Sequence, residues 1–335
     1  MNLLITGALG HIGSRLIREI SPRRVNRLLL LDNLSAHRQS SLFNLRGEVA
    51  CRFIEDDVCT ADLDRCFEGV DVVIHLAAIT NAEGSFTLRD EVEHTNYEGA
   101  KRVAEACARA GARLVFISTT SVYGPQREVV DEDCREDELK PQSPYAESKL
   151  RAERMLEETG REAGLRFVTC RFGTIFGASP GMRFHTAVNK FIWQACTGRP
   201  ATVWRTALHQ KRPYLELGDA VAAISHIVDN DLFDNRIYNV LTANATVNEI
   251  LEVIRLSVPD LQVGYVDSPI MNQLSYTVSS RRFLEQGFEF RGTLRQGIGE
   301  VIDLLRGLSP GRPPLPARHS APETAPAYSP RAAQW

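Results

Sequence analysis

The sequence of 335 residues contains no apolar run long enough to span a bilayer, which takes about 20 predominantly apolar residues. It also lacks an excess of one charge, because 39 basic side chains stand against 42 acidic ones and the formal net charge is −3. This balance gives no reason to expect nucleic acid or a membrane surface as a partner. An internal repeat is missing as well.

The sequence also lacks a pattern of paired cysteines. The seven cysteines are an odd number, and no two of them form a C-x-x-C pair. This pattern argues against a disulfide framework and against a zinc site, so we expect no metal. The N-terminus lacks the basic region and cleavage pattern of a signal peptide. We therefore expect a cytoplasmic protein whose cysteines are mostly small buried hydrophobes.

What is present is the composition of a globular protein, with 43% hydrophobic and 24% charged residues. Short apolar runs alternate with helical patterns along the first half of the chain. The expected strands are 2–6, 27–32, 52–55, 70–76, 113–118 and 167–172. The expected helices are 11–20, 61–68, 91–110 and 145–161. This alternation predicts an α/β fold with a Rossmann-type, doubly wound parallel sheet.

The second half of the chain is less regular. Helical patterns recur at 184–197, 220–230 and 247–256. We expect residues 1–170 to form a dinucleotide-binding domain. The chain should return to this domain at about residues 214–240. Residues 171–306 should form mainly a smaller C-terminal substrate-binding lobe at the carboxyl ends of the strands. Residues 307–335 hold seven of the 16 prolines, the composition of a disordered tail.

A glycine-rich loop, with Gly7, Gly10 and Gly13, follows the first strand and opens the first helix. Such a loop lets a pyrophosphate approach the backbone and the helix N-terminus. Asp32 ends the second strand, where a carboxylate would accept hydrogen bonds from the adenosine ribose and repel a 2′-phosphate. This favours NAD over NADP. Arg38, which could blur that preference, is interpreted as a solvated surface charge.

A pair of acidic residues, Asp56 and Asp57, ends the third strand. One carboxylate could hold the adenine amino group, or the pair could form a turn that caps the next helix. The spacing from the glycines favours Asp57 as the adenine contact.

Tyr145 and Lys149 stand four residues apart in an expected helix, so both side chains lie on one face. A nearby cation lowers the pKa of a phenol from its usual value of about 10, which would let Tyr145 act as a general base. Residues 117–124, rich in Ser and Thr, follow the fifth strand. Their hydroxyls could hydrogen-bond a substrate hydroxyl and the carbonyl it becomes, or they could simply form a turn.

With these motifs the sequence resembles the extended short-chain dehydrogenase/reductases, in particular the nucleotide-sugar epimerase/dehydratase group that includes UDP-glucose 4-epimerases. The resemblance covers about residues 1–306. The matching segments are Gly7–Gly13, Asp32, Asp57–Val58, His75–Ala78, Asn96, Ser118–Gly124, Tyr145–Lys149, Arg171–Gly177 and Lys211–Asp219.

The resemblance implies a catalytic triad of Thr119, Tyr145 and Lys149, with Lys149 also holding the nicotinamide ribose. Arg212 matches the arginine that binds the substrate diphosphate, and Asp219 of the same motif could equally be a helix cap. The implied cofactor-binding residues are Gly7, Gly10, His11, Ile12, Gly13, Asp32, Asn33, Asp57, Val58, Leu76, Ala77, Ala78, Asn96, Ser118, Tyr145 and Lys149. The implied substrate-binding residues are Thr119, Ser121, Tyr145, Thr174, Arg183, His185 and Arg212.

Departures from the family pattern narrow the chemistry. Dehydratases of the family carry an Asp-Glu pair directly after the catalytic threonine, and related decarboxylases keep a glutamate at the second position. Here these positions are Thr120 and Ser121. Thr174 stands where the family often has Asn. Arg183 and His185 lie in a stretch that differs from galactose epimerases, and they could contact a phosphate or a sugar substituent or be surface charges.

The resemblance therefore favours an NAD-dependent nucleotide-sugar epimerase, acting at C4 of a UDP-sugar through a transient 4-keto intermediate. One alternative is an NAD(P)H-dependent keto-sugar reductase or dehydrogenase. Another is a sensor or scaffold that binds NAD without chemistry. A sterol or polyketide alcohol also stays open as a substrate. We expect a homodimer, because the family pairs the helices at 91–110 and 145–161, which carry exposed-looking apolar positions.

Overall fold

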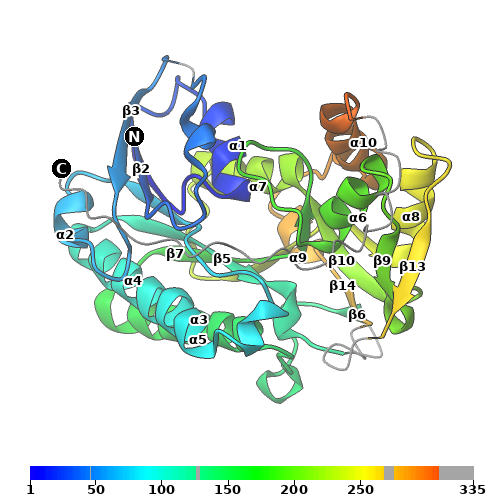
Figure 1. The fold of residues 1–335 in the computed structure, drawn as a ribbon. Coiled ribbons are helices and arrows are strands. Elements are labelled where there is room, and N and C mark those ends of the chain that lie inside the picture. Colours follow the sequence, from blue (N-terminus) through cyan, green and yellow to red (C-terminus); the bar gives the residue numbers. More distant parts are fainter. Residues whose placement is uncertain (46, 126–128, 268–274, 309–335) are drawn as a thin grey trace, which may run out of the picture.

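The computed structural model describes residues 1–45, 47–125, 129–267 and 275–308. Its main feature is a seven-stranded sheet in the order β11-β7-β5-β4-β1-β2-β3, with every neighbouring pair parallel (Figure 1). The strands are β1 (Asn2–Thr6), β2 (Arg27–Asp32), β3 (Ala50–Glu55), β4 (Val72–His75), β5 (Arg113–Thr119), β7 (Phe167–Phe172) and β11 (Ile237–Val240). The predicted doubly wound fold is confirmed.

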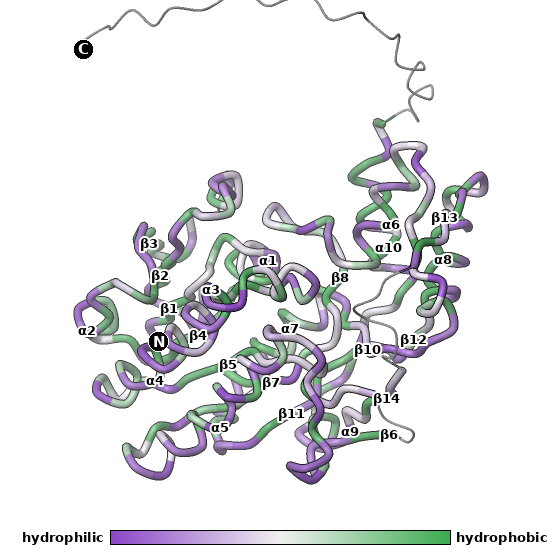
Figure 2. Tube along the Cα trace, turned by 60° about the horizontal axis from the view of Figure 1, so that its bottom comes forward, coloured by the Kyte–Doolittle hydropathy of each residue, from purple (hydrophilic) through white to green (hydrophobic). Residues whose placement is uncertain are grey.

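Helices cover both faces of this sheet, so its central strands are mostly apolar. Helices α1 (His11–Glu19) and α7 (Leu217–Asp229) pack on one face, and α2 (Leu63–Cys66), α4 (Gly99–Ala110) and α5 (Pro144–Ala163) on the other (Figure 1). The four leucines of β2 show why, because two face each helical layer and all are buried. Figure 2 shows the same contrast between hydrophobic strands and hydrophilic outer turns.

A π-helical turn, His94–Glu98, joins α3 (Arg89–Glu93) to α4, where the sequence predicts one uninterrupted helix. The extra residue of such a turn changes which side chains point inward. Here the turn contains Asn96, whose side chain is fully buried.

The smaller lobe has its own core and lies to the right of the large sheet in Figure 1. Its strands are β8 (Thr174–Phe176), β10 (Lys211–Glu216) and β12 (Ala243–Thr246) in one sheet, and the pairs β9 (Ala201–Trp204) with β13 (Val263–Val266) and β6 (Val129–Val130) with β14 (Thr277–Val278). Its helices are α6 (Ala187–Cys196), α8 (Val247–Arg255) and α10 (Leu294–Leu305). The short α9 (Arg281–Leu284) packs on β11.

The outward faces of α4 and α5 are charged. Every valine, leucine, methionine and cysteine on these two helices is buried, because each helix turns its apolar stripe toward the sheet. The exposed positions include Lys101, Glu105, Arg109, Arg154 and Glu158. Of the expected exposed apolar positions, Ala110 at the end of α4 is exposed, and Tyr97 and Ala108 are half-buried.

Within the described ranges, no helix combines the length and the apolar character that a membrane crossing requires. From residue 309 onward, the proline-rich tail expected at 307–335 lies outside the described residues.

Candidate active site

A cavity of about 620 Å³ opens where the strands of the large sheet end and the smaller lobe begins. Residues after β1, β2, β3, β4, β5 and β7 line it, since parallel strands bring their carboxyl ends to one edge. The sequence-predicted residues that line the cavity are Gly7, Gly10, His11, Ile12, Gly13, Asp32, Asn33, Asp57, Val58, Leu76, Ala77, Ala78, Ser118, Thr119, Ser121, Tyr145, Lys149, Thr174, Arg183, His185 and Arg212.

The glycine loop at one end of this cavity has no space for side chains. A Cβ added to Gly7 would lie 2.6 Å from the amide nitrogen of Ala77, and one on Gly13 would lie 2.4 Å from the carbonyl oxygen of Ala8. Gly7 also has a φ of +61°. Helix α1 is capped by Gly10 without a side-chain hydrogen bond, which leaves its first amides open to a ligand. This cradle of backbone donors fits the pyrophosphate of a dinucleotide.

Carboxylates follow β2 and β3 at the same end. Asp32 accepts hydrogen bonds of 3.0 Å from the amides of Leu9 and Leu34, so it also fixes the glycine loop. Asn33 donates to Asp57 over 2.7 Å. Burial alone would raise the pKa of Asp57, but hydrogen bonds from Cys59 and Asn33 outweigh burial and hold that pKa below its usual range.

Arg38 is half-buried and lines the cavity near Gly10. Its interpretation as a solvated surface charge is therefore wrong. Burial lowers the pKa of its guanidinium, and Asp32 opposes that change. The loop after β2 thus brings a cation and a carboxylate together at the same end of the cavity.

Tyr145 and Lys149 enter the cavity from the first turns of α5. The side chain of Ser143 accepts a hydrogen bond from the amide of Ala146, and Pro144 occupies the first turn, so the helix start is well defined. Lys149 is 3% exposed. Its ammonium lies 4.7 Å from the ring centre of Phe116 and reaches the end of β5.

The predicted effect of Lys149 on Tyr145 is wrong for this geometry. Burial raises the pKa of the Tyr145 phenol above its usual value, and Arg183 and a hydrogen bond with Thr119 offset only part of the increase. The Lys149 ammonium instead donates to a backbone carbonyl. Burial lowers the pKa of Lys149 to about 7, against the opposing charge of Glu153.

A buried polar network, which the sequence did not reveal, lies behind these residues. Glu153 accepts a hydrogen bond from Ser118 and forms an ion pair with Arg171, with 2.6 Å between Nη2 and Oε2. Arg171 also donates to the Tyr123 hydroxyl over 2.9 Å. The network joins α5 to the ends of β5 and β7. In the sequence, its other members lie in the matched segments Ser118–Gly124 and Arg171–Gly177, and Glu153 is marked only by following Lys149 by one helical turn.

Two predicted residues lie away from the cavity. Asn96 accepts a hydrogen bond of 2.8 Å from the Ile79 amide and donates one of 2.9 Å to the Ile79 carbonyl, so it fixes the segment after β4. Asp219 accepts from the amides of Arg291 and Gly292. Glu216, not Asp219, caps α7. Both side chains therefore hold backbone in place.

Some cavity residues had no sequence motif to mark them. Thr80 and Asn81 follow the recognised His75–Ala78 segment after one intervening residue, and Lys190 comes from α6. Their only sequence signal is their position, next to a motif or on an expected helix.

Comparison with known proteins now defines the class. Residues 3–240 match the model of the NAD dependent epimerase/dehydratase family, and the chain belongs to this family. It is an NAD-dependent enzyme of the extended short-chain dehydrogenase/reductase type. The resemblance seen in the sequence and the expected cofactor, NAD, are confirmed.

Relatives and solved structures show what the chain is similar to. A Bacillus subtilis protein described as an uncharacterized UDP-glucose epimerase is 32% identical over 238 residues, which are 68% of this chain and 72% of the relative. A trifunctional dehydratase/epimerase/reductase of UDP-sugars from Arabidopsis thaliana is 27% identical over 90% of this chain, but the chain spans only 46% of that relative. The UDP-glucose 4-epimerase of Thermus thermophilus, solved with NAD, superposes with a TM-score of 0.80 at 25% identity, covering 92% of this chain and all of that one.

Proposed function

We propose that the protein is an NAD-dependent nucleotide-sugar epimerase that inverts C4 through a transient 4-keto sugar. The observation that carries this proposal is the single cavity, which has the glycine loop at one end and Thr119, Tyr145 and Lys149 at the other. UDP-glucose epimerases among the relatives support a UDP-sugar as the substrate.

Each member of the triad has a role. Tyr145 removes the proton from the sugar hydroxyl once it is ionised to a phenolate, which the raised pKa of the free site makes the demanding part of the step. Thr119 donates a hydrogen bond to the oxygen as it becomes a carbonyl. Lys149, fixed against β5, holds the nicotinamide ribose. When bound, NAD would supply the redox chemistry by accepting a hydride from the sugar carbon and giving it back, with no net consumption of the cofactor.

The remaining roles follow the position of each residue along the cavity. Asp32 accepts hydrogen bonds from the adenosine ribose hydroxyls, and Asp57 accepts one from the adenine amino group. On the substrate side, Arg212 from β10 holds the diphosphate, with Thr174 from β8 beside it. Ser121 and His185 line the same space and complete the substrate contacts.

The residues after Thr119 support epimerisation over elimination. Thr120 is buried and donates to the Phe172 carbonyl over 3.3 Å, and Ser121 lines the cavity with a hydroxyl. Neither position offers a carboxylic acid that could protonate a leaving hydroxyl. A keto-sugar reductase is the second candidate, because it would use the same Tyr145–Lys149 pair and because the Arabidopsis relative includes such an activity.

The first experiment is to purify the protein without added cofactor and incubate it with UDP-, GDP-, CDP- and dTDP-sugars, following the products by NMR. An epimer formed without NADH supports a closed redox cycle and identifies the substrate. Conversion of a keto-sugar only after NADH is added would replace the epimerase by a reductase. Bound NAD with no turnover of any sugar would favour a sensor.

We further propose a cytoplasmic homodimer. All seven cysteines are unpaired, which supports a reducing compartment. The charged outer faces of α4 and α5 could pair through ion pairs in place of apolar packing. Light scattering during size-exclusion chromatography at low and high salt tests this, because an interface of ion pairs weakens as salt screens it.

A further inference from the structure

Arg183 is a cation in the cavity without an acidic partner. It lies on the segment between β8 and α6, and its Nε is buried and makes no hydrogen bond within the described part of the chain. The titratable groups that change its pKa are Arg38 and the Tyr145 phenol, and neither is a carboxylate. Arg183 as a whole is half-buried, and a cation withdrawn from water in this way is costly unless an anion joins it.

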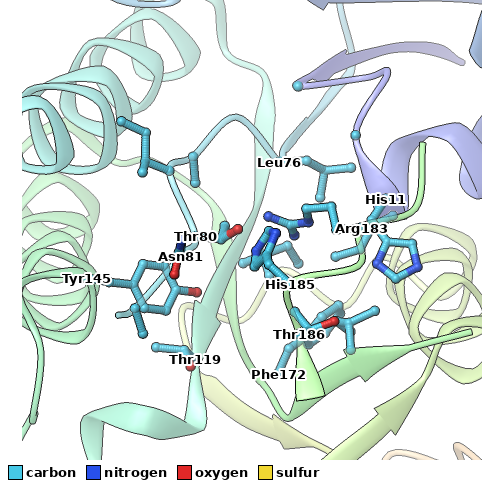
Figure 3. Close-up of a pocket in the computed structure, with 18 of the residues that line it drawn as sticks. His11, Leu76, Thr80, Asn81, Thr119, Tyr145, Phe172, Arg183, His185 and Thr186 are labelled. Carbon is cyan, nitrogen blue, oxygen red and sulfur yellow. The ribbon is translucent and has the colours of Figure 1, made fainter. Parts of the chain in front are cut away.

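The position of Arg183 indicates which anion. Arg38 lies beside Asp32 at the adenosine end of the cavity, and Tyr145 lies at the reacting end. Arg183 lies near enough to both, and to His11 at the start of α1, to influence their charge equilibria. In Figure 3 its guanidinium points from the His11 side toward the side that carries Tyr145. A bound dinucleotide has its pyrophosphate in this middle region, on the helix N-terminus.

The segment that carries Arg183 is fastened to the glycine loop. The ring of His11 donates from Nε2 to the Gly177 carbonyl over 2.9 Å. Ser179 donates to the carbonyl of His11 and the amide of Gly181 donates to Ser14, both over 2.9 Å. The backbones touch at Gly181, where an added Cβ would lie 2.2 Å from the Leu9 carbonyl oxygen.

We propose that Arg183, together with Arg38, clamps the pyrophosphate of bound NAD, so that the smaller lobe itself holds the cofactor in place. The clamp rests on one part of the proposed function, the use of NAD, and not on the fate of the sugar. It moves Arg183 from the substrate set to the cofactor set.

The physical reasons for the clamp are charge and shape. A guanidinium presents two parallel N–H donors that match two phosphate oxygens. Burial, with Arg38 adding repulsion, lowers the pKa of Arg183 to about 10, so it stays charged near neutral pH while repelling its neighbour. An anion between the two cations removes that repulsion. The clamp also suits a cycle in which the same NAD is oxidised and reduced without leaving.

The test is a ligand series measured without any sugar substrate. NAD and ADP-ribose, which share the pyrophosphate, and adenosine, which lacks it, are titrated against four proteins by calorimetry or NMR. These are the wild type, Arg183→Ala, Arg183→Lys and the control Arg199→Ala, whose arginine is exposed outside the cavity. Thermal unfolding of each variant without ligand checks that it folds.

We expect Arg183→Ala to weaken NAD and ADP-ribose equally, by about 10- to 100-fold, and to leave adenosine unchanged. Arg183→Lys should lose less, and Arg199→Ala nothing. Unchanged affinity of Arg183→Ala for NAD and ADP-ribose would overturn the clamp. A loss of affinity confined to NAD, or one that extends to adenosine, would overturn the clamp too. So would a wild-type protein that binds neither NAD nor ADP-ribose. Because no sugar is present, these outcomes are separate from failure of the epimerase proposal.

Discussion

The ammonium of Lys149 donates a hydrogen bond of 2.8 Å to the backbone carbonyl of Ile117. This bond ties the lysine to β5 at the residue before Ser118 and Thr119, and so it links the first turns of α5 to the end of β5. Tyr145, one helical turn earlier, is positioned by the same contact. The geometry of the proposed triad therefore depends on a backbone atom as well as on its three side chains.

Tyr145→Phe should reduce turnover by about 10²- to 10⁴-fold, because the variant removes the proposed general base. NAD affinity should stay nearly unchanged, since only the hydroxyl is lost. Steady-state kinetics and NAD titration check both expectations. The matched control is Tyr265→Phe on β13, a tyrosine that is 46% exposed and lies outside the cavity. A Tyr145→Phe protein with most of its activity would remove Tyr145 from the role of base.

His75 should make the protein less stable in acid. Burial first, and then Lys149, lowers the pKa of His75 to about 3, from about 6.5 in an unfolded chain. Between these values the unfolded chain binds a proton that the folded one does not. The free energy of unfolding therefore falls as pH drops below about 6.5, by about 1.4 kcal/mol per pH unit from this group.

His75→Phe should remove this contribution. Urea unfolding at several pH values from 6.5 down to 4.5 should give a shallower slope for the variant than for the wild type. Exposed His209, replaced by Phe, serves as the control and should leave the slope unchanged. Equal slopes for the wild type and His75→Phe would contradict the neutral, buried histidine. His11, whose pKa burial lowers to about 3 as well, accounts for part of the slope that remains.

Glu153→Gln should destabilise the fold by about 3–5 kcal/mol, because it leaves the Arg171 charge buried without its carboxylate. Urea unfolding measures the change. Asp64→Asn is the control, since Asp64 pairs with Arg109 at the surface, where a pair contributes about 0–1 kcal/mol. Similar effects of the two substitutions would mean that the buried pair adds no more than a surface one.

Gly181→Ala should push apart the two backbones that meet at the glycine loop. The added methyl would lie 2.2 Å from the Leu9 carbonyl oxygen, so we expect weaker NAD binding and a loss of stability of about 1–3 kcal/mol. Gly264→Ala on β13 is the control, because its nearest neighbour would be 3.7 Å away. Calorimetric titration with NAD and thermal unfolding compare the two variants. An unaltered NAD affinity in Gly181→Ala would show that the segment and the loop move independently.

The sequence predicts the large sheet well because its strands are buried on both faces. β1, β2 and β7 have the bounds that the sequence predicts. The smaller lobe could not be derived in this way, since most of its strands have only two to four residues and pair across long stretches of chain. The expected helix at 61–68 shrinks to Leu63–Cys66, and the π-helical turn before α4 has no sequence signal.

Within the site, residues near strand ends could be predicted because parallel strands bring those ends together. Asp32 and Thr119 reach the cavity for this reason. Contacts between distant segments could not be predicted. His11 meets Gly177 across 166 positions, and Arg38 comes close enough to Arg183 to act on it electrostatically. These contacts depend on how the smaller lobe packs against the glycine loop, and no local sequence pattern predicts that packing.

The order of strands has a consequence for exchanging parts between relatives. The chain leaves the large sheet after β7, builds β8 and β10, and returns with α7 and β11 before it continues to β12 and α8. A fragment cut after Phe172 would leave one edge of β7 unpaired and would lack the helix that covers β1. A chimera that borrows the smaller lobe of another enzyme therefore needs junctions near Phe172, Leu217 and Val240. Recombination at a single point would divide both hydrophobic cores.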